Sequence, residues 1–348
     1  MEIAHLPGKT GVSKPNTALV AGGGGFIGGH LARTLRERGV HVRSVDIKPF
    51  DGWYQIPEGV EALQLDLSVL ENCYTAVRDV DVVYNLAADM GGMGFIETHK
   101  AECMLSVLIN THMLMAARDE NVARFFFSSS ACVYAADKQV DADVTALKES
   151  DAYPAMPEDG YGWEKLFSER MCRHFREDFG VETRVARYHN VYGVEGTYDG
   201  GREKAPAALC RKIALAAITG RHEIEVWGDG GQTRSFMYVD DCIEGTLRVT
   251  AGDSAVPVNV GSSELVSINQ MIDIIEKIAG ITVKRNYNLD APKGVRGRNS
   301  DNTLIQQIYG WEPSISLADG LELTYRWIFD QLSSSERAGD RTPRRAAV

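Results

Sequence analysis

Short apolar runs recur along the first half of the chain, and polar or glycine-containing segments separate them. Between the runs, apolar residues fall at helical spacing, as do Ile27, Leu31 and Leu35 ahead of a glycine stop at Gly39. Five runs have the length of a buried strand: residues 17–21, 41–46, 62–66, 81–85 and 124–128. Strand–helix alternation predicts an α/β fold of the Rossmann type, a doubly wound parallel sheet with right-handed crossovers.

The alternation loosens after Val191, where long loops at residues 193–204 and 289–302 interrupt it. This change predicts a smaller mixed α/β lobe that binds substrate. We expect four parts: an N-terminal extension (residues 1–16), a Rossmann domain (17–190, with about 234–250 returning to it), the substrate lobe (mostly 191–330) and a disordered tail (333–348).

Composition narrows the function classes. The chain of 348 residues is 44% hydrophobic and carries a net charge of −11, which argues against a nucleic-acid partner. Its six cysteines are scattered, with no C-x-x-C pair and no metal-like spacing with histidine. No apolar run reaches the length of a membrane span, and the N-terminus lacks the blocks of a signal peptide. We therefore expect a cytoplasmic protein with no metal and no membrane partner.

A glycine loop follows the first predicted strand and opens the first helix. Gly22, Gly25 and Gly28 allow a tight turn, and the backbone N–H groups around Phe26 and Ile27 can approach a pyrophosphate. Asp46 ends the second strand, where a carboxylate accepts a hydrogen bond from the ribose 2′-hydroxyl and repels a 2′-phosphate. The pattern predicts bound NAD rather than NADP. Asp66 and Leu67, at the end of the third strand, are predicted to line the adenine.

Tyr161 and Lys165 lie four residues apart in a helix predicted over residues 159–179, so they share one helix face. An ammonium beside a phenol favours phenolate, which can accept a hydroxyl proton while hydride leaves the same carbon. Ser130, at the end of the fifth strand, is predicted to orient that hydroxyl. This set predicts oxidation and reduction at a carbinol.

Cys132 follows Ser130 by two residues, so in an extended chain both side chains point to the same side. A tuned thiol can act as an acid or base, and Lys204 is the predicted partner if burial lowers its basicity. A ketone at C4 of a sugar would acidify the hydrogens at C3 and C5, which such a pair could exchange. From the residues alone, Cys132 as a small buried filler remains an equal alternative.

The chain resembles the extended short-chain dehydrogenase/reductases that act on nucleotide sugars. More narrowly, it is similar to the GDP-mannose 3,5-epimerase family over about residues 17–331. The segments that carry the resemblance are residues 85–96, 129–132, 200–208, 227–236 and 294–302.

The resemblance implies an isomerase that holds NAD tightly and inverts GDP-mannose at C3 and C5 through a transient 4-keto sugar. GDP-L-galactose, GDP-L-gulose or both would be the products. It implies that Cys132 and Lys204 transfer protons, and that Tyr161 and Lys165 act in oxidation and reduction at C4. It also implies that the protein is a homodimer. The implied GDP-sugar contacts are Gly91, Ser130, Ala131, Cys132, Asn190, Glu203, Lys204, Ala205, Lys212, Gln232, Thr233, Arg234 and Arg298.

Other readings stay open. A relative could act on another GDP-sugar, such as a GDP-heptose, or invert a single centre with the same residues. A simple C4-epimerase typically has Thr at position 132, and a 4,6-dehydratase has an Asp-Glu pair where Ala131 and Cys132 stand. A cofactor-binding sensor without turnover is disfavoured because Tyr161 and Lys165 are both present.

Overall fold

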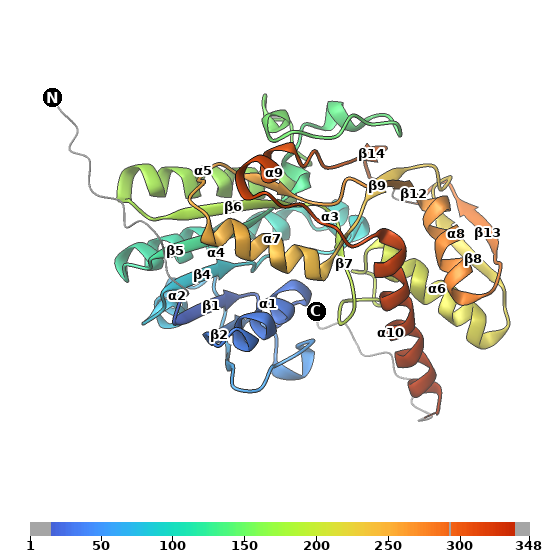
Figure 1. Cartoon of the computed structure of the whole chain (residues 1–348), viewed down its shortest axis with the longest axis horizontal. Coiled ribbons are helices and arrows are strands. Elements are labelled where there is room, and N and C mark those ends of the chain that lie inside the picture. Colours follow the sequence, from blue (N-terminus) through green and yellow to red (C-terminus); the bar gives the residue numbers. More distant parts are fainter. Residues whose placement is uncertain (1–14, 292–293, 338–348) are drawn as a thin grey trace.

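The computed structural model describes residues 15–291 and 294–337 (Figure 1). Its centre is a seven-stranded sheet in the order β11-β6-β5-β4-β1-β2-β3, and every neighbouring pair is parallel. The predicted Rossmann-type fold is thus confirmed. The strands are β1 (Thr17–Ala21), β2 (His41–Asp46), β3 (Glu61–Gln64), β4 (Val82–Asn85), β5 (Arg124–Ser130), β6 (Thr183–Tyr188) and β11 (Val258–Val260).

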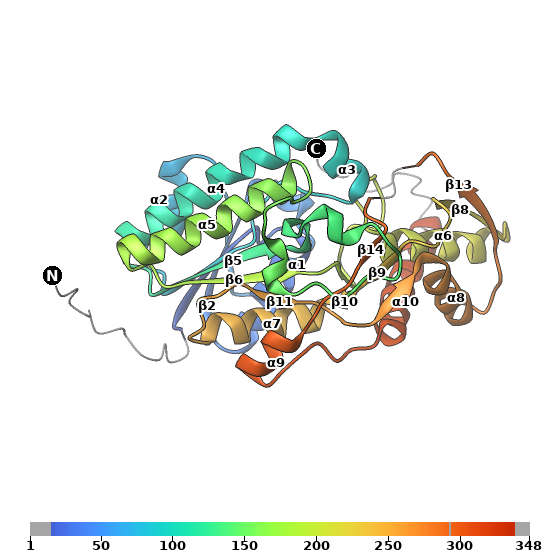
Figure 2. The same cartoon turned by 90° about the horizontal axis from the view of Figure 1, so that it is seen from above.

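Helices cover both faces of this sheet (Figure 2). One face carries α2 (Leu70–Val77), α4 (Lys100–Asp119) and α5 (Tyr161–Phe179), with the short α3 (Met93–Thr98) ahead of α4. The other face carries α1 (Phe26–Glu37), α7 (Val239–Ala251) and α9 (Thr303–Tyr309). Because both faces are covered, β4 is buried along its whole length, and its sequence is apolar up to Asn85 at the carboxyl end.

A smaller lobe lies beside the carboxyl ends of the strands (Figure 1). Three helices pack together in it: α6 (Ala205–Thr219), α8 (Ile268–Ala279) and α10 (Leu317–Arg337). The remaining described strands form three small sheets. These are β8 (Glu223–Trp227) with β13 (Lys284–Asn288), β9 (Thr233–Ser235) between β12 (Leu265–Ser267) and β14 (Gly297–Arg298), and β7 (Val191–Tyr192) with β10 (Met237–Tyr238).

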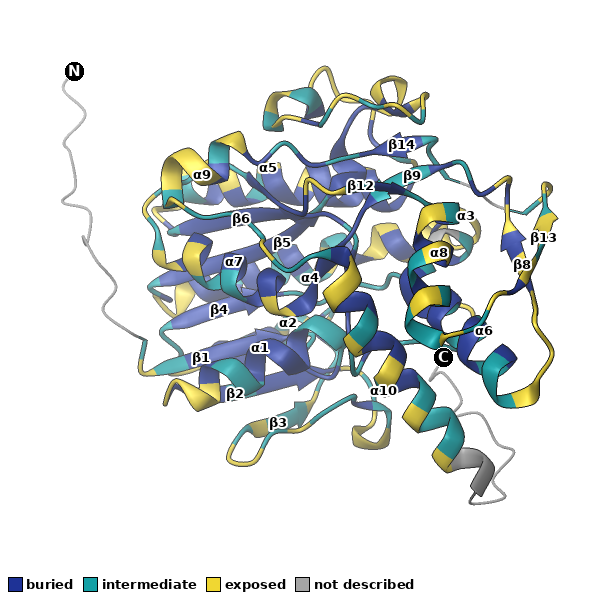
Figure 3. Cartoon of the chain, turned by 45° about the vertical axis from the view of Figure 1, so that its right-hand side comes forward, coloured by how far each residue is buried: buried dark blue, intermediate teal, exposed yellow. Residues whose placement is uncertain are grey.

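The hydrophobic core ties the two parts together. Leu31 of α1 and Val239 of α7 belong to the same buried cluster as Ile213 of α6, Met271 of α8 and Tyr325 of α10. A second cluster fills the opposite face of the sheet, under α2, α4 and α5. Figure 3 shows the buried sheet between these layers. The lobe is therefore held by apolar burial continuous with the Rossmann core.

Several boundaries differ from the sequence prediction. β3 ends at Gln64, so Asp66 and Leu67 lie in the turn that follows it. α10 continues to Arg337, so residues 333–337 of the expected tail are helical, and residues 1–14 and 338–348 lie outside the described residues. Residues 239–251 do return to the sheet, where α7 packs against α1 and β6. Within the described chain, no helix has both the length and the apolar character needed to cross a membrane.

Candidate active site

The glycine loop lies at the carboxyl end of β1, beside the point where the strand order reverses between β1 and β4. Gly22 and Gly23 donate backbone hydrogen bonds to the Val45 carbonyl at 2.8 and 3.0 Å. Gly22 has a φ of +82°, and a Cβ on Gly28 would lie 2.1 Å from the Gly22 oxygen. Both positions therefore require glycine. No side chain caps the N-terminus of α1, which leaves its N–H groups available to an anion.

The remaining predicted cofactor residues surround this loop. Asp46, largely buried at the end of β2, accepts a hydrogen bond from the Lys48 backbone N–H at 3.1 Å. The Lys48 ammonium lies 5.3 Å from the Tyr54 ring centroid. Phe26 lies against the loop of residues 193–204, where a Cβ on Gly196 would be 3.1 Å from its ring. The Leu67 side chain is in the hydrophobic core, so only its backbone can contact a ligand.

Tyr161 and Lys165 occupy the first two turns of α5, and both are buried. The Lys165 Nζ lies 5.4 Å from the Tyr161 ring centroid and 4.7 Å from that of Phe127. It also lies 3.6 Å from Glu164 Oε2, so a buried carboxylate offsets its charge. The structure thus brings the predicted pair together with an acidic neighbour that the sequence argument left out.

Burial opposes the phenolate form of Tyr161 that the sequence predicts. Burial raises the pKa of Tyr161 well above its usual value, and Cys132 and Glu164 raise it further. A hydrogen bond with Ser130 acts in the opposite direction. Desolvation thus favours the neutral phenol, and the role of Lys165 in favouring the phenolate stays a prediction.

Ser130 and Cys132 are close together, but not through the extended geometry predicted from the sequence. Ser130 is the last residue of β5, and residues 131–133 form a short 3₁₀ helix. The Ser130 Oγ caps this helix by accepting from the Cys132 N–H at 3.2 Å. A Cβ on Gly162 would lie 2.4 Å from the Cys132 carbonyl oxygen, so this glycine allows α5 to approach. Cys132 and Tyr161 consequently share one small buried cluster.

Lys204 reaches the same region from a distant part of the sequence. It directly precedes α6, whose start is marked by Pro206. Burial lowers the pKa of Lys204, Arg298 lowers it further, and Cys132 opposes the change. Burial raises the pKa of Cys132 to about 11, with Glu158 adding to the rise and Arg298 opposing it. The predicted thiol–amine pair is therefore electrostatically coupled within one partly buried site.

Arg298, on β14, lies against the Cys132 sulfur and is only 4% exposed. Its Nη1 is 3.6 Å from Cys132 Sγ, its Nε donates to Gln139 Oε1 at 2.6 Å, and its Nη2 donates to Glu158 Oε1. The sequence analysis missed Gln139 and Glu158. Glu158 precedes Tyr161 by three residues, but a lone carboxylate at that spacing matches no motif, so no sequence signal could have identified it.

Further predicted substrate residues line the approach to this cluster. A Cβ on Gly91 would lie 2.8 Å from Phe95, over whose ring the Arg202 guanidinium stacks at 3.8 Å. The Gly92 N–H donates to the Arg202 carbonyl at 3.0 Å, so residues 85–96 and 200–208 form one surface. Asn190, with a φ of +41°, donates to the Ser235 carbonyl at 2.9 Å.

The β9 strand supplies another group of these residues. Arg234 donates to the carbonyls of Thr233 and Val295, and Thr233 donates to the Ala142 carbonyl. Burial lowers the pKa of Arg234 to about 10, and Arg298 lowers it further while Glu158 opposes them. Gln232 donates to the Trp227 carbonyl at 2.9 Å. The strand therefore adds positive charge beside Arg298.

Other predicted contacts lie apart from the thiol. Lys212, two turns along α6, donates to the Glu225 carbonyl at 2.8 Å, and Glu203 Oε2 accepts from the Gly201 N–H. The Ala131 side chain packs in a small core with Leu147 and others, so only its backbone can reach a ligand. Ala205 is the first residue of α6. The assignment of these residues to the substrate stays a prediction.

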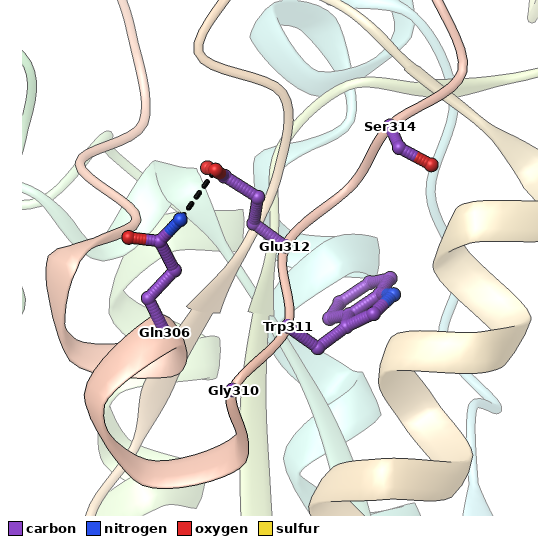
Figure 4. Close-up of a pocket in the computed structure, with 5 residues that line it drawn as sticks. All are labelled: Gln306, Gly310, Trp311, Glu312 and Ser314. Carbon is purple, nitrogen blue, oxygen red and sulfur yellow. Dashed lines mark hydrogen bonds between the residues drawn. The ribbon is translucent and has the colours of Figure 1, made fainter.

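A surface pocket near the end of α9 contains none of these residues (Figure 4). In it Gln306 donates a hydrogen bond to Glu312. Its lining residues are Gln306, Gly310, Trp311, Glu312 and Ser314. The predicted residues instead follow the carboxyl ends of β1, β4 and β5, and we place the candidate active site there. Among the residues described, no His, Cys, Asp and Glu side chains gather in a group of three or more able to hold a metal.

Fold and glycine loop together define a dinucleotide-binding α/β enzyme of the extended short-chain dehydrogenase/reductase type. Residues 18–261 match the model of the NAD dependent epimerase/dehydratase family, and the chain belongs to this family. It is 48% identical over 321 residues to GDP-mannose 3,5-epimerase 1 of Oryza sativa subsp. indica, covering 92% of this chain and 83% of the relative. It is 46% identical to GDP-mannose 3,5-epimerase of Arabidopsis thaliana, covering 92% and 84%.

A solved structure shares the fold over nearly the whole chain. UDP-glucuronic acid 4-epimerase from Bacillus cereus, in complex with UDP-glucuronic acid and NAD, superposes with a TM-score of 0.78. The two are 26% identical, and the match covers 91% of this chain and 99% of the other. The resemblance predicted from the sequence is thereby confirmed.

Proposed function

We propose that this protein is an NAD-dependent epimerase that inverts GDP-mannose at C3 and C5 through a transient 4-keto sugar. GDP-L-galactose, GDP-L-gulose or both are the products. The observation that carries the proposal is that Cys132 and Tyr161 share a buried cluster, with Lys204 near enough for its charge to interact with the thiol. A 4-epimerase or a dehydrogenase needs no such second acid–base pair. The names of the similar plant proteins support the choice of substrate.

The residues around the glycine loop fit a dinucleotide. Gly22, Gly25 and Gly28 leave the N–H groups at the start of α1 open to a pyrophosphate, and Asp46 is positioned to accept from a ribose hydroxyl. The carboxylate of Asp46 disfavours a 2′-phosphate, which supports NAD over NADP. When bound, NAD supplies reversible hydride acceptance at C4 and a positive nicotinamide that favours the Tyr161 phenolate.

At C4 the chain has to hold and move one hydroxyl proton. Tyr161 is the group that accepts it and later returns it. Ser130 accepts a hydrogen bond from the Cys132 N–H and lowers the pKa of Tyr161 against the effect of burial, so it links the phenol to the start of the 3₁₀ helix. Lys165 keeps the face of α5 that carries Tyr161 against β5, through its contact with the Phe127 ring and its ion pair with Glu164.

Cys132 and Lys204 exchange protons at the carbons next to the ketone. Burial raises the pKa of the thiol and lowers that of the amine, so the neutral forms of both are favoured. The amine can therefore accept a proton while the thiol donates one to the opposite face, and inversion follows. Reduction of the ketone then leaves the cofactor unchanged over the cycle.

The charge around the site suits a nucleoside diphosphate. Arg234 and Arg298 are crowded together, and burial lowers the pKa of Arg234. Lys212 adds a third cation on α6, and burial lowers its pKa too. An anionic diphosphate placed among these groups would relieve their mutual repulsion.

The test is incubation with GDP-mannose in heavy water. Deuterium should enter both C3 and C5, and NAD should remain bound without added cofactor. Cys132→Ser should lower this exchange by about 10²–10⁴-fold while NAD content is unchanged. Products from a panel of GDP-hexoses and GDP-heptoses then identify the sugar.

Each alternative has its own outcome. Label at one carbon alone would indicate a single-centre epimerase. Efficient turnover of a GDP-heptose alone would identify that sugar, rather than GDP-mannose, as the substrate. Absence of label at both carbons, or full exchange in Cys132→Ser, would contradict the proposed mechanism. NADH accumulation would indicate a net dehydrogenase.

We further propose that two chains pair through α4 and α5. These packed helices expose large apolar side chains on the outside of the molecule, where water would otherwise contact them. The exposed set is Met104, Leu105, Leu108, Trp163 and Phe167. Sedimentation should show a dimer that Leu105→Glu converts to a monomer, whereas the exposed control Leu323→Glu on α10 should leave the dimer intact.

We also propose a cytoplasmic location. The six cysteines are free and buried, so the fold uses them as thiols rather than as disulfides. The proposed acid–base role of Cys132 likewise needs a reduced thiol. Fractionation with a tagged chain is the measurement, and recovery in an oxidising compartment would contradict it.

A further inference from the structure

The buried carboxylate of Glu158 has no part in the chemistry described so far, although it lies at the centre of the proton-transfer cluster. Its side chain is 11% exposed, and its backbone N–H donates to the Cys132 carbonyl at 3.0 Å. One carboxylate oxygen accepts from Arg298 Nη2. The other oxygen, Oε2, is buried without a hydrogen-bond partner among the described residues.

A carboxylate in this position costs desolvation energy, and a hydrophobic residue would pack there without that cost. The contacts suggest what it does. Arg298 is held on one side by the neutral Gln139 and on the other by Glu158, and its third nitrogen faces the Cys132 sulfur. Glu158 therefore both orients the guanidinium and cancels its charge next to the thiol.

We propose that Glu158 is a positioning residue whose negative charge, acting with Arg298, sets the pH range in which Cys132 gives up its proton. The effect of Glu158 on turnover rests on the proposed function. The contacts among Glu158, Arg298 and Cys132 do not depend on which substrate binds. Without the carboxylate, the cation beside the sulfur would be unopposed and would stabilise the thiolate.

Other charged and titratable groups also face Cys132, and each must be held constant in a test. Glu158 raises the pKa of the thiol and Arg298 lowers it, which agrees in sign with the geometric argument. Cys132 also interacts with groups from the start of α5, the start of α6 and β9. Among the described residues, the groups that interact with the thiol include Cys103, Glu158, Tyr161, Lys204, Arg234 and Arg298, with the Ser130 hydroxyl.

The deciding experiment titrates the thiol directly in holoenzyme without substrate. Thiolate absorbance in the ultraviolet is recorded against pH for each variant and for a twin that also carries Cys132→Ser, so the difference reports Cys132 alone. In Glu158→Gln the midpoint should fall by about 1–3 pH units relative to the wild type. Gln139→Met, which removes the neutral partner of Arg298, should leave the midpoint within a few tenths of a unit.

Two further variants protect the test against misfolding of Glu158→Gln. Arg298→Gln leaves the carboxylate unopposed beside the sulfur, so its midpoint should rise. Glu158→Gln combined with Arg298→Gln removes both charges and should return the midpoint toward the wild-type value. Bound NAD and the thermal melting curve establish that each variant is folded.

Turnover supplies an independent readout. The pH profile of deuterium exchange should move to lower pH in Glu158→Gln, with kcat changed more than KM, and Glu158→Asp should restore most of the wild-type profile. An unchanged thiol midpoint in folded Glu158→Gln, or an equal shift in Gln139→Met, would overturn the inference. If the thiol midpoint shifts as expected but no exchange is seen in the wild type, the inference stands and the proposed function fails.

Discussion

The glycine loop and the thiol cluster lie in the same site but are assembled differently. Gly22, Gly28 and Asp46 come from one continuous β1-α1-β2 unit and act through backbone geometry and a strand-end carboxylate. Cys132, Glu158, Lys204 and Arg298 come from four separate segments, and their properties depend on one another. The comparison teaches that cofactor binding is a local property of this chain, whereas proton transfer is a property of its tertiary structure.

The largest effect is expected from Gly28→Ala. Its Cβ would lie 2.1 Å from the Gly22 oxygen, so the loop and α1 must move apart. NAD should be absent from the purified protein and turnover lost, because the glycine loop and the N-terminus of α1 bind the dinucleotide together. Cys132→Ser, in contrast, should retain NAD and lose only exchange.

Nucleotide released on denaturation, measured by chromatography per chain, checks this difference. Gly94→Ala is the matched control, since a Cβ there is 3.8 Å from Trp227, an ordinary contact. Stoichiometric NAD in Gly28→Ala would show that cofactor binding does not depend on the glycine loop as proposed.

Lys204→Met should almost abolish exchange and also change the pH dependence of stability. Burial holds the pKa of Lys204 below its usual 10.5, so the unfolded chain binds more protons than the folded one between the two values. The stability of the wild type therefore rises with pH through that window. Lys204→Met removes an amine whose charged form burial disfavours, so the variant should melt higher than the wild type at neutral pH.

That advantage should shrink as pH approaches about 10, where the unfolded lysine also loses its proton. Thermal unfolding of both proteins across this range is the measurement. The exposed Lys284→Met on β13 should show no such trend. A constant difference across pH would mean that Lys204 is not desolvated.

Asp46→Asn should weaken NAD binding by about 10-fold, because a charged acceptor for the ribose hydroxyl is lost. It should also narrow the preference for NAD over NADP, since the repulsion of a 2′-phosphate disappears. Titration of cofactor-depleted protein with each dinucleotide measures both effects. Asp51→Asn, exposed in the turn after β2, should alter neither affinity.

The smallest effect is expected from Tyr54→Phe, which tests the junction of the two halves. The Tyr54 hydroxyl is hydrogen-bonded to Thr197, joining the segment after β2 to the loop that leads to Lys204. Losing one such bond should speed NAD release by about 2- to 10-fold with little change in exchange per bound NAD. Tyr153→Phe, at an exposed site, is the control, and equal release rates would show that this link does not retain NAD.

Much of the fold could be predicted from local pattern. The strands predicted at residues 17–21 and 41–46 coincide with β1 and β2. The apolar run of β1 follows from its cover on both faces, whereas β2 keeps an exposed His41 and a partly exposed Arg43. The prediction was weaker where a side-chain hydrogen bond sets the backbone conformation. Ser130 caps a 3₁₀ turn at Cys132, and that turn replaced the extended geometry expected there.

The site was predictable in the same uneven way. Tyr161 and Lys165 could be paired because a helix makes residues four apart neighbours. The direction of the Tyr161 pKa could not be predicted, since burial and the neighbours Cys132 and Glu164 decide it. Glu158 escaped notice because its partner Arg298 is 140 residues away in the chain.

By itself the sequence determined the strand–helix alternation, the glycine turn and the Asp46 acceptor, since each depends on backbone geometry within one unit. Only the tertiary structure decided that Cys132, Lys204 and Arg298 meet, and that Glu158 lies between a cation and a thiol. The physical reason is that desolvation and Coulomb interactions depend on distance in space, and spacing along the chain does not reveal that distance.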